Sequence, residues 1–399
     1  MTTFLNNYNN SIYETDYADE YNGVVRVSNG ESYGTGTLLY DGRSILTAAH
    51  VFEGKDTDNI TVYFDTQRGT VGYSATVTVY DGYDSENTNG DLAILTLEEN
   101  PSSLYQRYDI YRSSFEIGND FTMVGYGAYG SGRTGELDLD TLLKLKTQNT
   151  FEADFYDIDA LLYTNLAWEP LENSILVADF DNGYSSADAL GNILNITDTG
   201  LGITEGMIAS GDSGGAAFID GVVAGVASYT ASVSYNGIDT DINDSIDSSF
   251  GELGAWQRVS YYSQWIDQII RANYTNAPTT KEEVQTAIYE KDDGSISYTY
   301  FLLEFLGDRT SISDDISLQY STRDGSANAG EDYIETSGII TLYQDESSVA
   351  IPVEIIGDSI VEEDETFYLD VTNSSYGSFT EDVSLTAVRT IVNDDFMIG

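Results

Sequence analysis

Three short motifs carry the residue types that hydrolyse amide or ester bonds. His50 ends the segment SILTAAH and is the only histidine among 399 residues, Asp91 begins DLAILTL, and Ser213 is the centre of GDSGG. A serine hydroxyl becomes a good nucleophile when a neighbouring base takes its proton. An imidazole can be that base, and a buried carboxylate fixes its tautomer and stabilises the imidazolium. The three motifs therefore predict a Ser–His–Asp triad.

The glycines of GDSGG predict a binding site for negative charge beside the nucleophile. They allow the backbone N–H groups of Gly211 and Ser213 to converge on the oxyanion of a tetrahedral intermediate. The same letters also fit the G-x-S-x-G pattern of α/β-hydrolases. In those enzymes the histidine follows the serine in the chain, and here no histidine follows Ser213. The order His, Asp, Ser therefore argues against that alternative.

The segments around these motifs are predicted to be mainly β-strands. From Val24 onward, short runs with alternating apolar residues are separated by turn residues, which predicts an antiparallel barrel or sandwich. Residues 131–206 read as extended loops with some strand. Tyr261–Ala272 has apolar residues at helical spacing and predicts one amphipathic closing helix.

A second all-β module follows a linker predicted at residues 276–283, around Pro278. Within residues 284–399, apolar and polar residues alternate in three runs, which indicates half-buried strands of a sandwich. The apolar positions of these runs are Ile316, Leu318 and Tyr320; Val349, Ile351, Val353 and Ile355; and Phe367, Leu369 and Val371.

The composition limits the classes of partner. The chain has 67 acidic and 16 basic residues and a formal net charge of −51, so nucleic acid and anionic membrane surfaces are poor partners. It has no cysteine, which excludes disulfides, and no apolar run of membrane-spanning length. The first residues lack both a basic segment and an apolar core, so they do not resemble a Sec signal peptide.

Residues 22 to about 272 resemble the trypsin/chymotrypsin family of serine peptidases. TAAH, DLAIL, GDSGG and the final strand plus helix occur in the family's order. The resemblance implies a chymotrypsin-like double β-barrel with a C-terminal helix over residues 22–275. It also implies a serine endopeptidase with His50, Asp91 and Ser213 as the triad and with Gly211 and Ser213 as the oxyanion hole.

The family pattern also implies which residues select the substrate. Met207, six residues before the nucleophile, stands where the family places the floor of the S1 pocket, and a methionine cannot pair with Arg or Lys. The family pattern places the pocket walls at Ser228, Thr230 and Gly254, and Thr230 would make the pocket narrower than a glycine would. We expect cleavage after small or medium uncharged residues.

Activation is where the sequence departs from the family. There, a freed terminal amine pairs with the residue at Asp212, and counting back places that terminus near Ser11–Tyr13. We therefore expect residues 1–21 to form an N-terminal segment with a propeptide to about residue 11. No Lys or Arg precedes Arg26, so cleavage ahead of Ile12 would need a protease of another specificity, or the enzyme itself.

Residues 281–395 resemble a Calx-beta domain in the segments YSTRDGSANAGEDY, IIGDSIVEEDETF and IVNDD. The resemblance implies an immunoglobulin-like sandwich that binds structural Ca²⁺ at one end, whereas catalysis needs no cofactor. Ca²⁺ prefers six to eight oxygen ligands, several of them charged. The matching ligand positions are Glu290, Asp332, Asp358, Glu362, Glu365, Asp394 and Asp395.

A second acidic segment, VADFDNG, holds Asp179, Asp181 and Gly183. It hints at a metal loop, but its spacing does not fit the EF-hand pattern, and we expect a solvated turn.

Together these features predict a secreted, calcium-stabilised serine endopeptidase exported by an unknown route. Its partners would be a protein or peptide substrate and a surface or protein bound by the C-terminal module. The alternative is a calcium-dependent binding or adhesion protein whose peptidase domain is an inactive scaffold.

Overall fold

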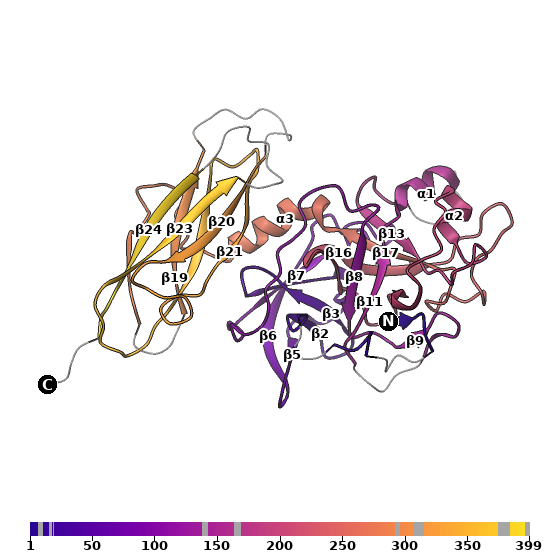
Figure 1. The fold of residues 1–399 in the computed structure, drawn as a ribbon, viewed down its shortest axis with the longest axis horizontal. Coiled ribbons are helices and arrows are strands. Elements are labelled where there is room, and N and C mark those ends of the chain that lie inside the picture. The colour runs from indigo at the N-terminus through magenta and orange to yellow at the C-terminus, as the bar shows by residue number, and fades with distance from the viewer. Residues whose placement is uncertain are drawn as a thin grey trace. The chain divides into compact units, whose positions relative to one another are not determined.

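The computed structural model describes residues 1–6, 11–15, 18, 20–137, 143–162, 169–291, 296–305, 315–373 and 384–395. The chain divides into two compact units, Met1–Ile269 and Ile270–Gly399. Both are built mainly from strands, as Figure 1 shows, and the predicted all-β class is confirmed.

A closed six-stranded barrel forms one half of the first unit. Its strand order is β2-β3-β4-β7-β6-β5. Apolar residues alternate along β5, where Ile60, Val62 and Phe64 are buried, which is the expected pattern for a barrel strand. The bounds are β2 Val24–Ser28, β3 Tyr33–Leu38, β4 Ser44–Thr47, β5 Ile60–Thr66, β6 Gly69–Val79 and β7 Ala93–Leu97.

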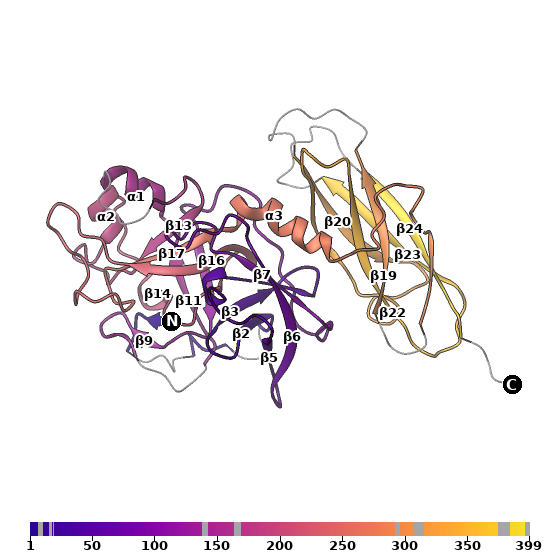
Figure 2. The ribbon, with the colours of Figure 1, turned by 180° about the vertical axis from the view of Figure 1, so that it is seen from behind.

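A seven-stranded antiparallel sheet forms the other half, in the order β11-β8-β15-β16-β17-β13-β12. Its strands are β8 Asp120–Gly125, β11 Leu145–Thr150, β12 Ala153–Asp154, β13 Ile175–Asp179, β15 Ala216–Ile219, β16 Val222–Ala231 and β17 Leu253–Arg258. Phe121, Phe151 and Trp256 pack together in its core. A four-stranded sheet joins β10 Gly135–Glu136, β9 Gly130–Ser131, β1 Thr2–Thr3 and β14 Gly206–Met207. The beginning of the chain is therefore integrated into this unit (Figure 2).

The helices confirm one prediction and correct another. The closing helix α3 spans Val259–Ala272, two residues longer than predicted. Two short helices, α1 Phe155–Leu162 and α2 Ala189–Leu194, lie within the segment for which only loops and strands were predicted. Phe155, Ile158 and Leu162 are buried at helical spacing, a pattern too short to stand out in the sequence. Two 3₁₀ turns, η1 Ala49–Val51 and η2 Gly202–Thr204, complete the unit.

The second unit is a β-sandwich. A five-stranded sheet, β18-β24-β23-β20-β21, accompanies the pair β19-β22. The bounds are β18 Ala287–Tyr289, β19 Ile296–Glu304, β20 Ile316–Asp324, β21 Ser337–Leu342, β22 Ser348–Ile356, β23 Glu365–Asn373 and β24 Ser384–Val392. All ten apolar positions predicted to alternate in β20, β22 and β23 are buried.

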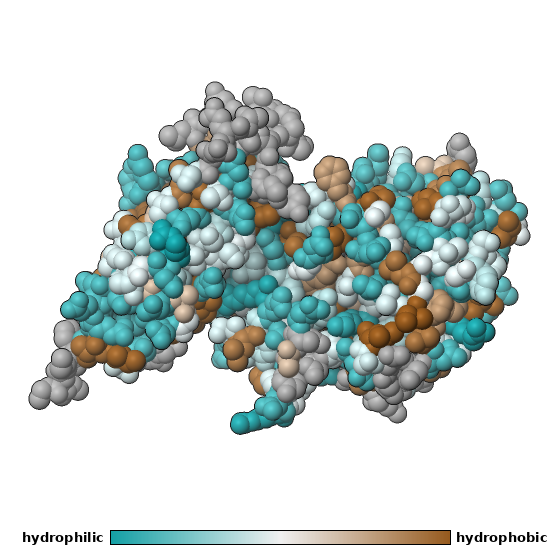
Figure 3. All heavy atoms as spheres, in the orientation of Figure 1, coloured by the Kyte–Doolittle hydropathy of each residue, from teal (hydrophilic) through white to brown (hydrophobic). Residues whose placement is uncertain are grey.

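Polar residues cover most of the face shown in Figure 3, as the acidic composition requires. No helix among the described residues is both long and apolar enough to cross a bilayer.

Candidate active site and calcium cluster

His50 and Asp91 meet at one end of an antiparallel strand pair. Thr47 of β4 pairs with Ala93 of β7, so residues just after β4 lie beside those just before β7. His50, in η1, donates its backbone N–H to Asp91 Oδ1 at 2.8 Å, and its Nδ1 lies 2.7 Å from Asp91 Oδ2. The carboxylate side chain is 3% exposed and the imidazole 35% exposed.

Ser213 reaches the other side of the same ring from a loop before β15. Its Oγ lies 2.8 Å from His50 Nε2. The loop is fixed against the barrel, because Thr35 of β3 donates its N–H to the carbonyl of Ser213 at 2.8 Å. Gly214 has a φ of +84°, and a Cβ there would lie 2.2 Å from Thr47 Oγ1, so only glycine allows this approach. The three residues predicted to form a triad are thus linked by hydrogen bonds.

The surroundings of His50 favour its protonated form. Burial alone lowers the pKa of the imidazole and is the largest single influence. The hydrogen bond that the ring donates to Asp91 and the negative charges of Asp91 and Glu53 oppose this effect, and together they raise the pKa of His50 above its ordinary value.

Asp91 has a further hydrogen-bond partner, Ser228. Ser228 was expected in the wall of the specificity pocket, but its Oγ donates to Asp91 Oδ2 at 2.5 Å. A β-bulge explains the difference, since Ala227 and Tyr229 pair with β17 and the residue between them does not. The bulge turns the Ser228 side chain towards the buried carboxylate.

The predicted oxyanion donors lie in a tight turn beside Ser213. The carbonyl of Ser210 accepts a hydrogen bond from the N–H of Ala128 at 2.7 Å. The C=O and N–H of one trans peptide point in opposite directions, so the N–H of Gly211 points away from Ala128. Gly211 has a φ of +93°, and a Cβ would lie 2.8 Å from the Tyr33 ring. The turn therefore depends on glycine at this position.

The ion pair expected at Asp212 forms with a different residue. The terminal ammonium of Met1 lies 2.8 Å from Asp212 Oδ2, and both groups are 1% exposed. Asp212 also accepts the N–H groups of Gly127 at 2.8 Å and Ala209 at 3.0 Å. The prediction placed a terminus near Ser11–Tyr13 here. Tyr13 is instead a buried core residue within the chain, while strand β1 brings Met1 to Asp212.

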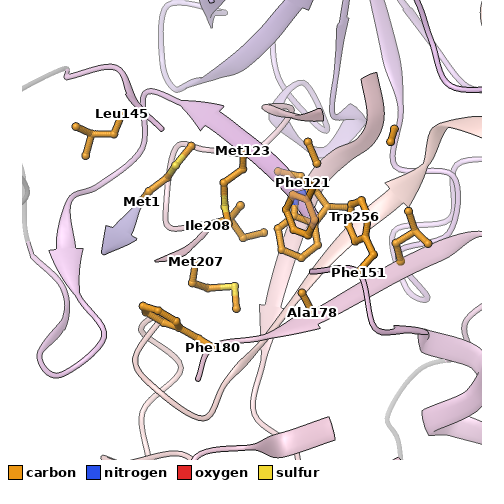
Figure 4. Close-up of a cluster of buried hydrophobic side chains, with 14 of the residues drawn as sticks. Met1, Phe121, Met123, Leu145, Phe151, Ala178, Phe180, Met207, Ile208 and Trp256 are labelled. Atoms are coloured by element: carbon orange, nitrogen blue, oxygen red, sulfur yellow. The ribbon is translucent and has the colours of Figure 1, made fainter. Parts of the chain in front are cut away.

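Three of the four residues predicted to line the specificity pocket come together. Thr230 and Gly254 are opposite each other in β16 and β17, and a Cβ on Gly254 would lie 2.4 Å from Met207 Sδ. Met207 is fully buried, with Phe180 and Ile208 beside it in Figure 4. Its side chain lies beside Gly254, where the sequence analysis placed the floor of the pocket.

Three predicted calcium ligands converge at one end of the sandwich. One carboxylate oxygen from each of Asp332, Glu362 and Glu365 lies within 4.8 Å of the other two. Burial, the hydrogen bond with Asp332 and the neighbouring negative charges raise the pKa of Glu365 to about 7. Oxygens at this spacing fit the first shell of a Ca²⁺ ion, so these residues suit the cation that the sequence implies.

The other predicted calcium ligands differ in how closely they interact with this cluster. Burial and then the charge of Asp358 raise the pKa of Glu290 to about 7, with smaller contributions from Glu362 and Asp332. Asp395 is close enough to raise the pKa of Glu362, although burial and three nearer carboxylates contribute more. Asp394 has a buried Oδ1 without a hydrogen-bond partner, and no contact joins it to the cluster within the described part of the sandwich.

The acidic segment that we expected to be a solvated turn is buried instead. Asp179 and Asp181 are each 1% exposed, and they share a site with Asp188 at the start of α2. The side chain of Asp188, just beyond the VADFDNG segment, completes this site, which is why the segment alone did not reveal it.

Two family models match the chain in the expected order. The Trypsin model matches residues 12–154, which include His50 and Asp91, and the Calx-beta domain model matches residues 303–395. The chain contains a trypsin domain followed by a Calx-beta domain. The trypsin match begins at Ile12, so the family pattern itself does not cover the terminus that reaches Asp212.

Curated relatives match part of the chain. The sodium/calcium exchanger Calx of Drosophila melanogaster is 34% identical over 87 residues, which is 22% of this chain and 9% of that protein. Sodium/calcium exchanger 3 of Rattus norvegicus is 45% identical over 62 residues, 16% of this chain and 7% of that protein. The chain thus spans less than a tenth of the length of these two relatives.

A solved structure of neuropsin, a serine protease expressed in the limbic system of mouse brain, was also found. It is 14% identical, with a TM-score of 0.47, and the match covers 65% of this chain and 98% of neuropsin.

Sequence reasoning missed three features of the first unit. Met1 had no visible signal, because its position depends on strand pairing across the domain. The contact of Ser228 with Asp91 depends on a bulge. The alternation of Asp179 and Asp181 was visible, since residues two apart along an extended chain share a face, but their burial was not.

Proposed function

We propose that the chain is a serine endopeptidase. The observation that carries the proposal is the continuous hydrogen-bonded path from Asp91 through His50 to Ser213 Oγ, with both links below 3 Å. This arrangement of acid, base and nucleophile has the geometry that acyl transfer requires.

In the proposed reaction, Ser213 Oγ attacks the scissile carbonyl carbon while its proton moves to His50 Nε2. Asp91 holds the ring by Nδ1 and stabilises the imidazolium. The N–H groups of Gly211 and Ser213 bind the oxyanion, a contribution worth about 3–4 kcal/mol for a donor of this kind. His50 then gives its proton to the leaving amine, and a water molecule, deprotonated by His50, releases the acyl group.

The buried ion pair of Met1 and Asp212 supports an organised site in the chain that begins at Met1. Asp212 lies between the two proposed oxyanion donors, and its carboxylate accepts hydrogen bonds from Gly127 and Ala209 as well as the ammonium. We infer that an ammonium paired with Asp212 organises the turn that carries the oxyanion donors, and a terminus freed by cleavage ahead of Ile12 stays a prediction.

We propose specificity for small uncharged residues before the scissile bond. Met207 is fully buried and contacts Gly254, so its side chain occupies the depth of the pocket. Thr230, opposite Gly254, narrows the entrance. Neither side chain can neutralise a basic substrate residue.

We propose that the Calx-beta domain binds structural Ca²⁺ through Asp332, Glu362 and Glu365, with Glu290, Asp358 and Asp395 nearby and Asp394 adjacent in the chain. Extracellular calcium modules bind at about 10⁻⁴–10⁻³ M. Such an affinity would suit a secreted protein, and we propose that location. The domain would either stabilise the protein or attach it to a surface or protein partner.

A fluorophosphonate probe tests the enzymatic proposal, because it reacts with an activated serine. We expect the full chain to be labelled in calcium buffer and Ser213→Ala to remain unlabelled. Ser210→Ala, which removes a nearby hydroxyl bonded to Glu136, is the matched control and should label. Failure of the parent to label would favour an inactive scaffold within a binding protein.

A further inference from the structure

A second group of carboxylates converges inside the trypsin domain, away from the proposed triad. Asp179 ends β13, Asp181 follows two residues later, and Asp188 caps the N-terminus of α2. They are 1%, 1% and 4% exposed. One oxygen from each lies within 4.8 Å of the other two. Figure 1 shows β13 and α2 near each other at this side of the unit.

Asp181 provides an independent sign that this group binds a ligand. Its Oδ1 is buried and has no hydrogen-bond partner, although the side chain lies in the acidic group. A buried carboxylate oxygen without a partner costs about 1–3 kcal/mol or more. The other members are held in place, because Asp179 Oδ2 accepts the N–H of Leu190 at 2.7 Å and Asp188 Oδ1 accepts that of Gly191 at 2.5 Å.

Further acidic residues surround the three aspartates. Glu205 is fully buried and accepts the N–H groups of Asp181 and Leu201, each at 2.7 Å. Burial raises its pKa to about 8, with added effects from Asp179 and Asp198. Glu152 accepts the N–H of Asp179 at 3.2 Å. No Lys or Arg forms an ion pair with these groups in the part of the chain that the structure describes.

We propose that Asp179, Asp181 and Asp188 bind a divalent cation, Ca²⁺, inside the trypsin domain. Three hard oxygen donors, rather than nitrogen or sulfur, match calcium chemistry, and oxygens at this spacing can touch one ion at 2.3–2.6 Å. The cation gives Asp181 Oδ1 the partner that the protein does not supply. It also offsets the repulsion among buried carboxylates that otherwise requires them to take up protons.

The site lies next to the strand that holds the chain terminus. Glu205 accepts the N–H of Phe4 at its carbonyl, at 3.0 Å, and β14, which begins at the following residue, pairs with β1. A cation on Asp181 therefore fixes the segment against which Met1 is inserted. Calcium binding would stabilise the trypsin domain independently of the Calx-beta domain.

Equilibrium dialysis of the full chain with ⁴⁵Ca²⁺ tests the site by counting bound equivalents. Asp181→Asn removes a ligand charge at nearly constant volume. Asp188→Ser removes another and keeps a residue that can cap α2, so at least one variant should fold. Asp198→Asn is the matched control, because this nearby acid is outside the group of three. Repeating the titration with Mg²⁺ identifies the preferred cation.

We expect Asp181→Asn and Asp188→Ser each to lose one bound equivalent, or to weaken it about tenfold or more, while Asp198→Asn binds as the parent does. Asp332→Asn should remove a different bound Ca²⁺ ion, the one in the Calx-beta domain. The double variant with Asp181→Asn should therefore lose two bound ions. Parental stoichiometry and affinity in both variants would overturn the proposal. So would an Asp181→Asn protein that is more stable than the parent both in EDTA and in calcium, since that result means the carboxylates hold protons alone.

Discussion

The ammonium of Met1 lies 2.8 Å from Asp212 Oδ2, with both groups sealed from solvent. Since removing one partner of a buried ion pair costs about 3–5 kcal/mol, blocking this amine should disorganise the neighbouring turn. We predict that acetylation of Met1, or an uncleavable N-terminal extension, lowers kcat/KM at least about 100-fold. The same extension at the C-terminus is the control. Unchanged turnover by the N-terminally extended protein, with its mass verified, would contradict an activating role for Met1.

The contacts of Asp91 predict the pH profile of turnover. His50 acts as a base only when neutral, and its pKa is raised, so kcat/KM should rise with pH through an apparent pKa above about 6.5. Asp91→Asn removes the charge that raises the pKa and should lower kcat about 10⁴-fold. Ser228→Ala removes one of several hydrogen bonds to the Asp91 carboxylate but leaves its charge, so it should cost far less, about 10–100-fold. A profile in Asp91→Asn identical to that of the parent would argue against this role.

The buried side chain of Met207 predicts how specificity can be changed. Met207→Ala should open space beside Gly254 and shift cleavage in a peptide library towards larger apolar residues, at a stability cost of about 2–5 kcal/mol. Met207→Leu conserves volume and should keep the parental preference. If the alanine variant folds and retains the parental preference, Met207 does not set the depth of the pocket.

The carboxylates at the end of the sandwich predict a calcium-dependent melting temperature. Without a cation, Asp332, Glu362 and Glu365 repel one another, so EDTA should lower the Tm of the Calx-beta domain by several degrees. Glu365→Gln should reduce the stabilisation by calcium, whereas Glu363→Gln, an exposed neighbour outside the cluster, should preserve it. Differential scanning calorimetry measures both effects. Identical melting curves in EDTA and in calcium would show that this domain is not stabilised by calcium.

Local patterns in the sequence predicted most of the fold. Alternation identified the buried face of β20, β22 and β23, because a period of two reports directly which residues face a core. The closing helix was equally visible from its apolar spacing. The helices α1 and α2 were missed, since one or two turns with few apolar residues give little periodic signal.

The sequence motifs predicted the residues of the proposed triad, but they did not predict the contacts around them. His50, Asp91 and Ser213 are brought together as expected, whereas Asp212 pairs with Met1, a contact that no motif indicates. Short-range order cannot reveal that β1 lies between β9 and β14. The role of Ser228 was also missed, since a bulge moves a side chain to a new direction without changing the residue types around it.

Because His50 is the chain's only histidine and its two ring nitrogens contact Asp91 and Ser213, the protein carries a built-in spectroscopic reporter. Labelling histidine with ¹⁵N would give a single imidazole spin system that needs no assignment. Its two nitrogen shifts would follow tautomer, protonation and inhibitor binding at the proposed catalytic centre in one spectrum.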